Sequence, residues 1–175
     1  MNITVYMGSN AGHDPAYKEA ATELGRFIGE NGHTLVYGGS NEGLMGVVAD
    51  TVMENGGNVI GVFPLNLEGI EGKHPHIHKL IMAQDIRARR AKMIALGDVF
   101  IALPGGPGTM EEITEVMSLA RIDQLNGLCT LLNVNGYYDD LKAQYDKMVE
   151  EGFISSQERG RIMFLDSVEE LERIL

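Results

Sequence analysis

The first half of the chain repeats one pattern of hydrophobic and polar positions. A short apolar run is followed by a glycine-containing turn, and then by a stretch with apolar residues at helical spacing. Short apolar runs bounded by turn residues are typical of strands buried on both faces, whereas recurrence every three or four positions predicts a helix with one buried face. The alternation of the two indicates βα units and therefore a parallel sheet.

The residues at the ends of these segments predict where the elements begin and end. Asp14 is expected to cap the first helix, Pro15 to be its first residue, and Asn31 with Gly32 to stop it. Strands are predicted at residues 3–7, 34–37, 59–63, 77–82, 99–103 and 128–134. Helices are predicted at residues 15–30, 44–54, from 85 to about 96, from 110 to about 124, at 138–150 and from 167 onward, and residues 64–75 are expected to form a long loop.

Repeated βα units predict an α/β fold with a doubly wound parallel sheet in a single domain over residues 1–175. A chain of this length with 44% hydrophobic residues can bury a substantial core. In such folds, ligands bind outside the carboxyl ends of the strands. The glycine-rich turns that follow the strands near Met7, Tyr37 and Leu103 all belong to that edge.

Charge and cysteine content narrow the classes of partner. A formal net charge of −11 disfavours nucleic acid, whose binding requires a basic surface that neutralises phosphates. A small phosphorylated ligand remains compatible with this negative charge, because a few local donors can bind one phosphate. Cys129 is the single cysteine, so neither an intrachain disulfide nor a Cys-x-x-Cys site is expected. Neither a signal peptide nor an apolar stretch long enough to span a bilayer is evident, and the expected location is the cytoplasm.

Residues 104–109, Pro-Gly-Gly-Pro-Gly-Thr, form the strongest local signal. Glycines directly after a buried strand bring backbone N–H groups to the start of a helix, where the helix dipole also favours an anion. The segment lacks the lysine of a Walker A loop, and neither it nor the turn at Gly8 spells G-x-G-x-x-G, which argues against ATP hydrolysis and against NAD. The alternative interpretation is a tight turn without a ligand.

Glu112 has two interpretations. It follows Thr109 by three positions, so Thr-x-x-Glu could be a capping box in which the Glu112 carboxylate bonds the Thr109 backbone N–H. Alternatively, a carboxylate in the first helical turn stays ionised beside the phosphate loop, where it could stabilise an oxocarbenium-like sugar or orient a water molecule.

A cluster of four basic residues stands out against the acidic background: Arg87, Arg89, Arg90 and Lys92. On a helix, Arg89 and Arg90 would point about 100° apart, so they are not all expected to reach one site, and a solvated helix face is the alternative.

Three alternating histidines also occur, at His74, His76 and His78. In an extended segment they would share a face as metal ligands do, but further ligands are not evident and Pro75 interrupts the segment, so no metal is expected.

The chain resembles the Lonely Guy family, whose signature Pro-Gly-Gly-x-Gly-Thr-x-x-Glu is found at residues 104–112 with every fixed position matched. The likeness extends to Gly8-Ser9, to residues 37–39 and 43–46, and to residues 132–138, in the expected order along most of the chain. The resemblance implies a Rossmann-like fold and hydrolysis of the N-glycosidic bond of adenine-type nucleoside 5′-monophosphates, either AMP or cytokinin riboside 5′-monophosphates. It also implies a homodimer with the site at the dimer contact, and no cofactor.

The family's catalytic pair, an arginine and the signature glutamate, corresponds to Arg89 and Glu112 here. Its substrate-binding positions correspond to Glu71, Arg89, Arg90, Gly105, Gly106, Pro107, Gly108, Thr109, Met110 and Glu111, with Glu68 as an alternative to Glu71. The usual Met-His-x-Arg-Lys is Ile-Arg-Ala-Arg-Arg at residues 86–90, so the histidine is lost and arginine replaces lysine, which keeps the charge and changes its geometry.

Two other functions compete with this one. Relatives have carried the label lysine decarboxylase, but no lysine lies next to residues 104–109 to form a Schiff base beside a phosphate site. The remaining alternative is a nucleotide-binding or sensor protein without catalysis.

Overall fold

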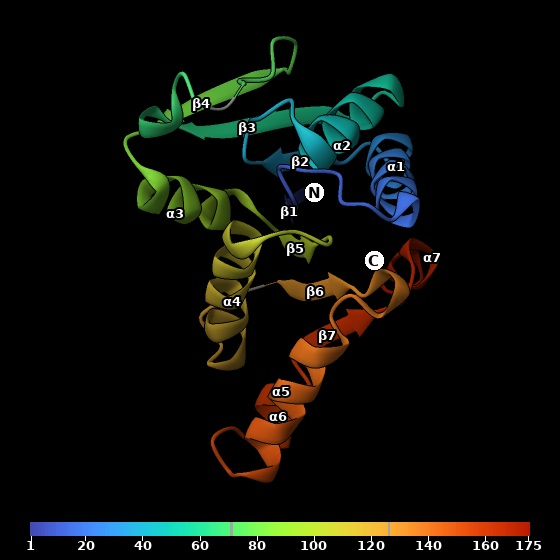
Figure 1. Cartoon of the computed structure of the whole chain (residues 1–175), viewed down its shortest axis with the longest axis vertical. Helices are drawn as coiled ribbons and strands as arrows, with labels where there is room; N and C mark the ends of the chain where they lie inside the picture. Colours follow the sequence, from blue (N-terminus) through green and yellow to red (C-terminus); the bar gives the residue numbers. More distant parts are fainter. Residues whose placement is uncertain (71, 126) are drawn as a thin grey trace.

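The computed structural model describes residues 1–70, 72–125 and 127–175. Its strands form one parallel sheet in the order β4-β3-β2-β1-β5-β6-β7, with helices on both faces (Figure 1). The strands are β1 (Asn2–Tyr6), β2 (Thr34–Tyr37), β3 (Asn58–Pro64), β4 (Lys79–Ala83), β5 (Val99–Ala102), β6 (Leu128–Leu132) and β7 (Ile162–Leu165). The helices are α1 (Pro15–Glu30), α2 (Gly43–Glu54), α3 (Ile86–Leu96), α4 (Pro107–Arg121), α5 (Asp139–Glu150), α6 (Ser156–Arg159) and α7 (Val168–Glu172). Short 3-10 turns occupy Leu65–Leu67 and Val134–Gly136.

The predicted fold class is confirmed, and the predicted helices and strands are present with shifts at their ends. The largest shift is in α4, which begins at Pro107 rather than at Met110, because proline is well suited to the first position of a helix. The β7 strand and the one-turn helix α6 were not predicted. The four apolar residues of β7 lack the glycine-rich turn that marks the other strands, and a run this short is ambiguous between strand and helix.

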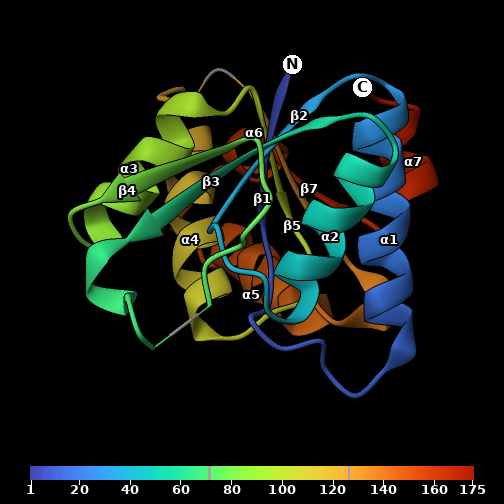
Figure 2. The same ribbon diagram turned by 90° about the horizontal axis from the view of Figure 1, so that it is seen from above.

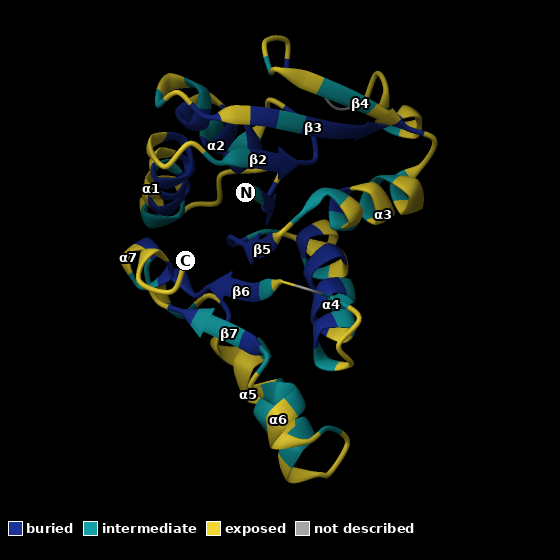
Figure 3. Ribbon diagram, turned by 180° about the vertical axis from the view of Figure 1, so that it is seen from behind, coloured by how far each residue is buried: buried dark blue, intermediate teal, exposed yellow. Residues whose placement is uncertain are grey.

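Alternation along the strands divides the core between the two faces of the sheet. In β1, Ile3 and Val5 pack with α1, α2 and α7, whereas Tyr6 packs with residues of α3 and α4. Successive side chains of a strand point to opposite faces, so both faces of β1 are apolar and both are covered. Figure 2 shows α1, α2 and α7 on one side of the sheet and α3 and α4 on the other. Figure 3 shows the buried central strands and the exposed end formed by α5, α6 and the turn between them.

Side-chain caps begin α1 and α3 where they were predicted. The carboxylate of Asp14 accepts from the N–H of Ala16 at 2.9 Å, and that of Asp85 accepts from the N–H of Ala88 at 2.8 Å. Such caps satisfy N–H groups that the helix itself leaves without a partner.

The strand order reverses at β1, which lies between β2 and β5. The chain therefore leaves β1 and β5 toward opposite sides of the sheet, and a crevice opens between the loops at their carboxyl ends. The Gly8 N–H donates to the Pro104 carbonyl at 3.2 Å, so these loops are in contact at the base of the crevice. Within the described residues, none of the helices is both long and apolar enough to cross a membrane.

Candidate active site at the β1/β5 edge

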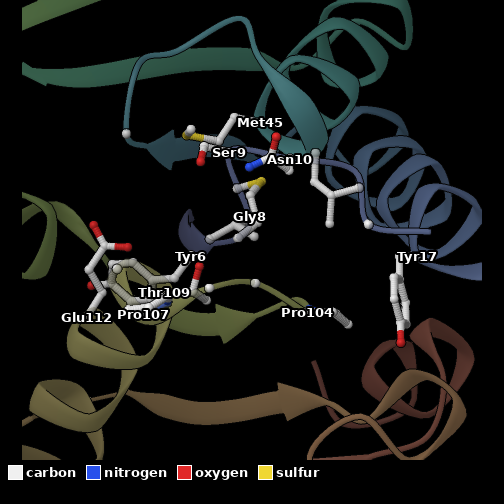
Figure 4. A pocket seen from close by; sticks show the side chains of 18 of the residues that line it. Tyr6, Gly8, Ser9, Asn10, Tyr17, Met45, Pro104, Pro107, Thr109 and Glu112 are labelled. Carbon is white, nitrogen blue, oxygen red and sulfur yellow. The ribbon is translucent and has the colours of Figure 1, made fainter. Parts of the chain in front are cut away.

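A cavity of about 400 Å³ lies at this crevice. Its walls include residues 5–12, which end β1 and follow it, and residues 104–109, which connect β5 to α4. Figure 4 shows Glu112 and Tyr6 near one end and Tyr17 at the other, with Gly8, Ser9 and Pro104 between them. A ligand in the cavity would therefore contact both glycine-rich turns.

Residues 104–109 present N–H groups that no described residue uses. The N–H groups of Gly105, Gly106, Gly108 and Thr109 donate no hydrogen bond within the part of the chain that the structure describes. The start of α4 at Pro107 places the last two in its first turn, where a helix leaves its N–H groups free and its dipole favours an anion. The segment has the features expected of a phosphate-binding loop.

Arg89 and Glu112 meet at one end of the cavity. Arg89 Nη2 donates to Glu112 Oε1 at 2.5 Å, and the two side chains are only 12% and 9% exposed. The Nε atom of Arg89 is buried and has no partner among the described residues. Because a buried donor without an acceptor is costly, this nitrogen is suited to bind an acceptor on a ligand.

The capping-box interpretation of Glu112 is wrong. Thr109 lies inside α4, the N-cap is Gly106, and no side chain caps this helix. Glu112 therefore belongs to the second turn of α4, not the first, and its carboxylate pairs with Arg89 of α3. Both differences from the prediction, the position of Thr109 inside the helix and that of Glu112 in the second turn, follow from the earlier start of α4 at Pro107.

Burial dominates the electrostatics of this carboxylate. Removal from water raises the pKa of Glu112, while the positive charges of Arg89 and, more weakly, Arg90 oppose the rise. The phenol of Tyr6 lies beside it, and burial together with the Glu112 charge raises the pKa of Tyr6. Tyr6 is therefore a neutral hydroxyl at the wall of the cavity.

Arg90 does not line the cavity formed by the described residues. Its Nη1 donates to Glu111 at 2.6 Å and its Nε to Glu115 at 2.8 Å, so it ties α3 to the outer face of α4. The divergence of Arg89 and Arg90 expected from helix geometry is thus observed. Arg87 and Lys92 are exposed.

Met110 is not among the described cavity-lining residues either, and it packs against the core beneath α4. Glu71 lies outside the described residues. Its alternative, Glu68, is exposed in the loop between β3 and β4 and pairs with Lys73 at 2.5 Å.

The three histidines have separate surroundings. His74 Nε2 lies 3.1 Å from Asp50 Oδ1, and the ring of His78 accepts from the N–H of Val59 at 3.2 Å. The structure brings no group of three potential metal ligands together among the described residues.

Sequence reasoning missed several residues of the cavity: Tyr6, Asn10, Met45, Tyr17 and Tyr137. Tyr17 was predicted as a buried helical position, and Met45 and Tyr137 entered only through the resemblance. The signal that could have found Tyr6 is the alternation of β1, because this tyrosine follows Thr4 on one face, at the end of the strand where ligands bind.

Comparison with known proteins settles the family. A family model described as "Possible lysine decarboxylase" matches residues 45–175. The chain is 42% identical over 173 residues to a cytokinin riboside 5′-monophosphate phosphoribohydrolase of Arabidopsis thaliana, covering 99% of this chain and 80% of the relative. It is 38% identical over 169 residues to a protein of the same name from Rhodococcoides fascians, covering 96% of this chain and 85% of the relative.

The chain belongs to the Lonely Guy family. Its fold also matches the structure of a molybdenum cofactor binding protein from Rippkaea orientalis, with a TM-score of 0.69 over 99% of this chain and 96% of the other. At 22% identity, that likeness concerns the fold alone. In this Lonely Guy chain, the signature motif is the loop and first turns that carry the free N–H groups and Glu112.

Proposed function

We propose that this Lonely Guy protein hydrolyses the N-glycosidic bond of adenine-type nucleoside 5′-monophosphates, AMP or a cytokinin riboside 5′-monophosphate, and releases the base and ribose 5-phosphate. The names of its relatives support this class of reaction. The observation that carries the proposal is the buried pair of Arg89 and Glu112, 2.5 Å apart, beside a loop whose N–H groups have no acceptor among the described residues.

The loop is assigned to the 5′-phosphate. The N–H groups of Gly105, Gly106, Gly108 and Thr109 supply donors, and the N-terminus of α4 supplies a positive potential. Because these donors are backbone groups, they are held in place by the fold before the ligand arrives. A single phosphate can be bound in this way even in a strongly acidic chain.

Glu112 is assigned to the ribose. As the C1′–N9 bond breaks, the base leaves with the bonding electrons and positive charge develops on the sugar, which the ionised carboxylate stabilises. A water molecule then forms the new bond to C1′ and its proton passes to Glu112, which gives it up again, so that the departing base gains one proton and the carboxylate is ionised for the next turnover. The Nε of Arg89, which has no partner among the described residues, is assigned to the nucleotide. It either donates a hydrogen bond to the leaving base or only anchors the nucleotide in the cavity.

The remaining predicted contacts are assigned to an assembled form of the protein. Arg90, Met110 and Glu111 do not line the cavity of the described single chain. A homodimer with the site at its contact would give Arg90 and Glu111 access to substrate, whereas the contact predicted for Met110, which packs against the core, stays a prediction. Glu71 is assigned to substrate binding as well.

We propose the cytoplasm as the location of this protein.

The decisive experiment compares the wild type with Glu112→Gln. Glutamine keeps an acceptor for Arg89 but carries no charge, so kcat should fall by about 10²- to 10⁴-fold while AMP still binds. Release of adenine from AMP, and of isopentenyladenine from its riboside monophosphate, is followed by chromatography. Glu150→Gln, an exposed carboxylate on α5, is the matched control and should retain wild-type turnover.

A Glu112→Gln variant with ordinary kcat would remove this residue from the mechanism. A wild-type protein that binds AMP without releasing adenine would instead be a non-catalytic nucleotide sensor, which is the alternative function.

A further inference from the structure

We propose that Tyr137 is a positioning residue that holds the phosphate loop in its anion-binding conformation. Its hydroxyl donates to the Gly105 carbonyl at 2.6 Å, although Tyr137 lies far along the chain, between β6 and α5. The inference deepens the proposed function, since it takes the bound anion to be the 5′-phosphate of the substrate.

Three consecutive carbonyls of the loop are each fixed from outside it. The Leu103 carbonyl accepts from the hydroxyl of Tyr138 at 2.7 Å, that of Pro104 from the N–H of Gly8 at 3.2 Å, and that of Gly105 from Tyr137. With their carbonyls engaged elsewhere, the loop residues keep their N–H groups for a ligand.

Peptide geometry explains why the last of these bonds matters most. In a planar trans peptide, the carbonyl of one residue and the N–H of the next point in opposite directions. The bond from Tyr137 to the Gly105 carbonyl therefore sets the direction of the Gly106 N–H. A Cβ atom placed on Gly106 would meet nothing within 4 Å, so packing does not hold this part of the loop. Gly105 is packed against Thr109 and Gly8, but Gly106 would otherwise sample many conformations.

The Tyr137 ring is itself held in place. It makes edge contacts with Tyr17 at 5.6 Å and with Tyr138 at 5.0 Å between ring centroids. Nearby, the Asn135 amide donates to Asp14 at 2.9 Å, which joins this segment to the start of α1. Asn135 adopts the left-handed conformation, with φ of 51°, in which asparagine is one of the tolerated residues. The donor is thus fixed before any ligand binds.

Tyr137→Phe tests the inference, because it removes the hydroxyl and keeps the ring. The residue is 42% exposed, so the melting temperature should change little. Affinity for inorganic phosphate and for ribose 5-phosphate, measured by calorimetry, should fall about three- to tenfold, the loss expected for one hydrogen bond. KM for AMP should rise by the same factor while kcat stays within about twofold, and affinity for adenine alone should not change.

Tyr145→Phe, on α5 and outside the cavity, is the matched control and should leave all these quantities unchanged. Unaltered phosphate affinity in Tyr137→Phe would overturn the inference. So would a fall in kcat with no change in KM, because the loop would then act on the transition state alone.

The calorimetric measurement does not require turnover, which separates this inference from the proposed function. If the wild type cleaves no nucleotide and Tyr137→Phe still weakens phosphate binding, the proposed hydrolysis fails and the positioning role stands. If the wild type cleaves AMP and the variant binds phosphate as well as the wild type does, the proposed hydrolysis stands and the positioning role fails.

Discussion

Arg89 and Glu112 come from different helices and meet where both are nearly excluded from water. At the scale of these residues, two effects compete. Desolvation disfavours the charged carboxylate, and the permanent charge of the neighbouring guanidinium favours it. For Glu112, desolvation is the larger effect, so its pKa lies above the ordinary value. In the proposed mechanism, the group that must be ionised to stabilise a cationic sugar is therefore held at a raised pKa.

The pH dependence of activity should report this balance. Protonation of Glu112 removes the charge that we propose to be catalytic, so kcat/KM should fall on the acid side with a midpoint above 4.5, the ordinary pKa of a glutamate. The measurement is initial-rate hydrolysis of AMP across the acid range. The Arg89→Gln variant lacks the positive charge that opposes protonation of Glu112. The acid midpoint of its remaining activity should therefore lie at higher pH than that of the wild type. A wild-type midpoint at or below 4.5 would contradict this account.

At the scale of elements, α1 and α2 approach each other closely through glycines of α1. A Cβ atom on Gly25 would lie 2.7 Å from Cβ of Thr51, and one on Gly29 would lie 2.7 Å from Cβ of Asn55, both partners being in α2 or at its end. This close contact fixes α2, and with it Met45 at the cavity wall. The glycines of α1 thus act on the site through packing.

Gly25→Ala should lower the free energy of unfolding. Alanine favours a helix over glycine by roughly 0.5–1 kcal/mol, but overpacking at such a contact typically costs about 1–3 kcal/mol, so the clash should prevail. Urea unfolding followed by circular dichroism gives the difference. Glu23→Ala, an exposed change on the same helix, should stay within about 0.5 kcal/mol of the wild type. Unchanged or increased stability in Gly25→Ala would mean that the two helices separate without cost.

At the scale of the whole molecule, the net charge of −11 is spread over a chain of 175 residues. Many ion pairs are exposed, such as Lys147 with Glu151 and Lys142 with Asp146, and pairs of this kind contribute little to stability. Repulsion among the excess carboxylates should therefore outweigh them in the compact state.

Added sodium chloride should raise the melting temperature, because it screens this repulsion more than it weakens exposed pairs. Differential scanning calorimetry between about 0.01 M and about 1 M salt, over which the Debye length shrinks from about 30 Å to about 3 Å, measures the effect. Potassium chloride should act equally if screening is the cause. A melting temperature that falls with salt would show that ion pairs dominate.

Local patterns were sufficient for the parallel α/β sheet, for the caps at Asp14 and Asp85, and for the glycine-rich turn between β5 and α4, because each depends on neighbours in sequence. They were insufficient for β7, whose short run carries no distinct period, and they placed the start of α4 three residues too late.

Glu112, Arg89 and the loop at residues 104–109 could be named from the sequence and the family signature it carries. Only the tertiary structure decided that Glu112 faces Arg89 instead of capping its own helix, that Arg90 turns toward Glu111 and Glu115, and that Tyr137 fixes the Gly105 carbonyl. The physical reason is that these contacts join α3 to α4 and the β6–α5 segment to the β5–α4 loop, which are far apart in the sequence. Local patterns contain no information about which distant side chains share a cavity.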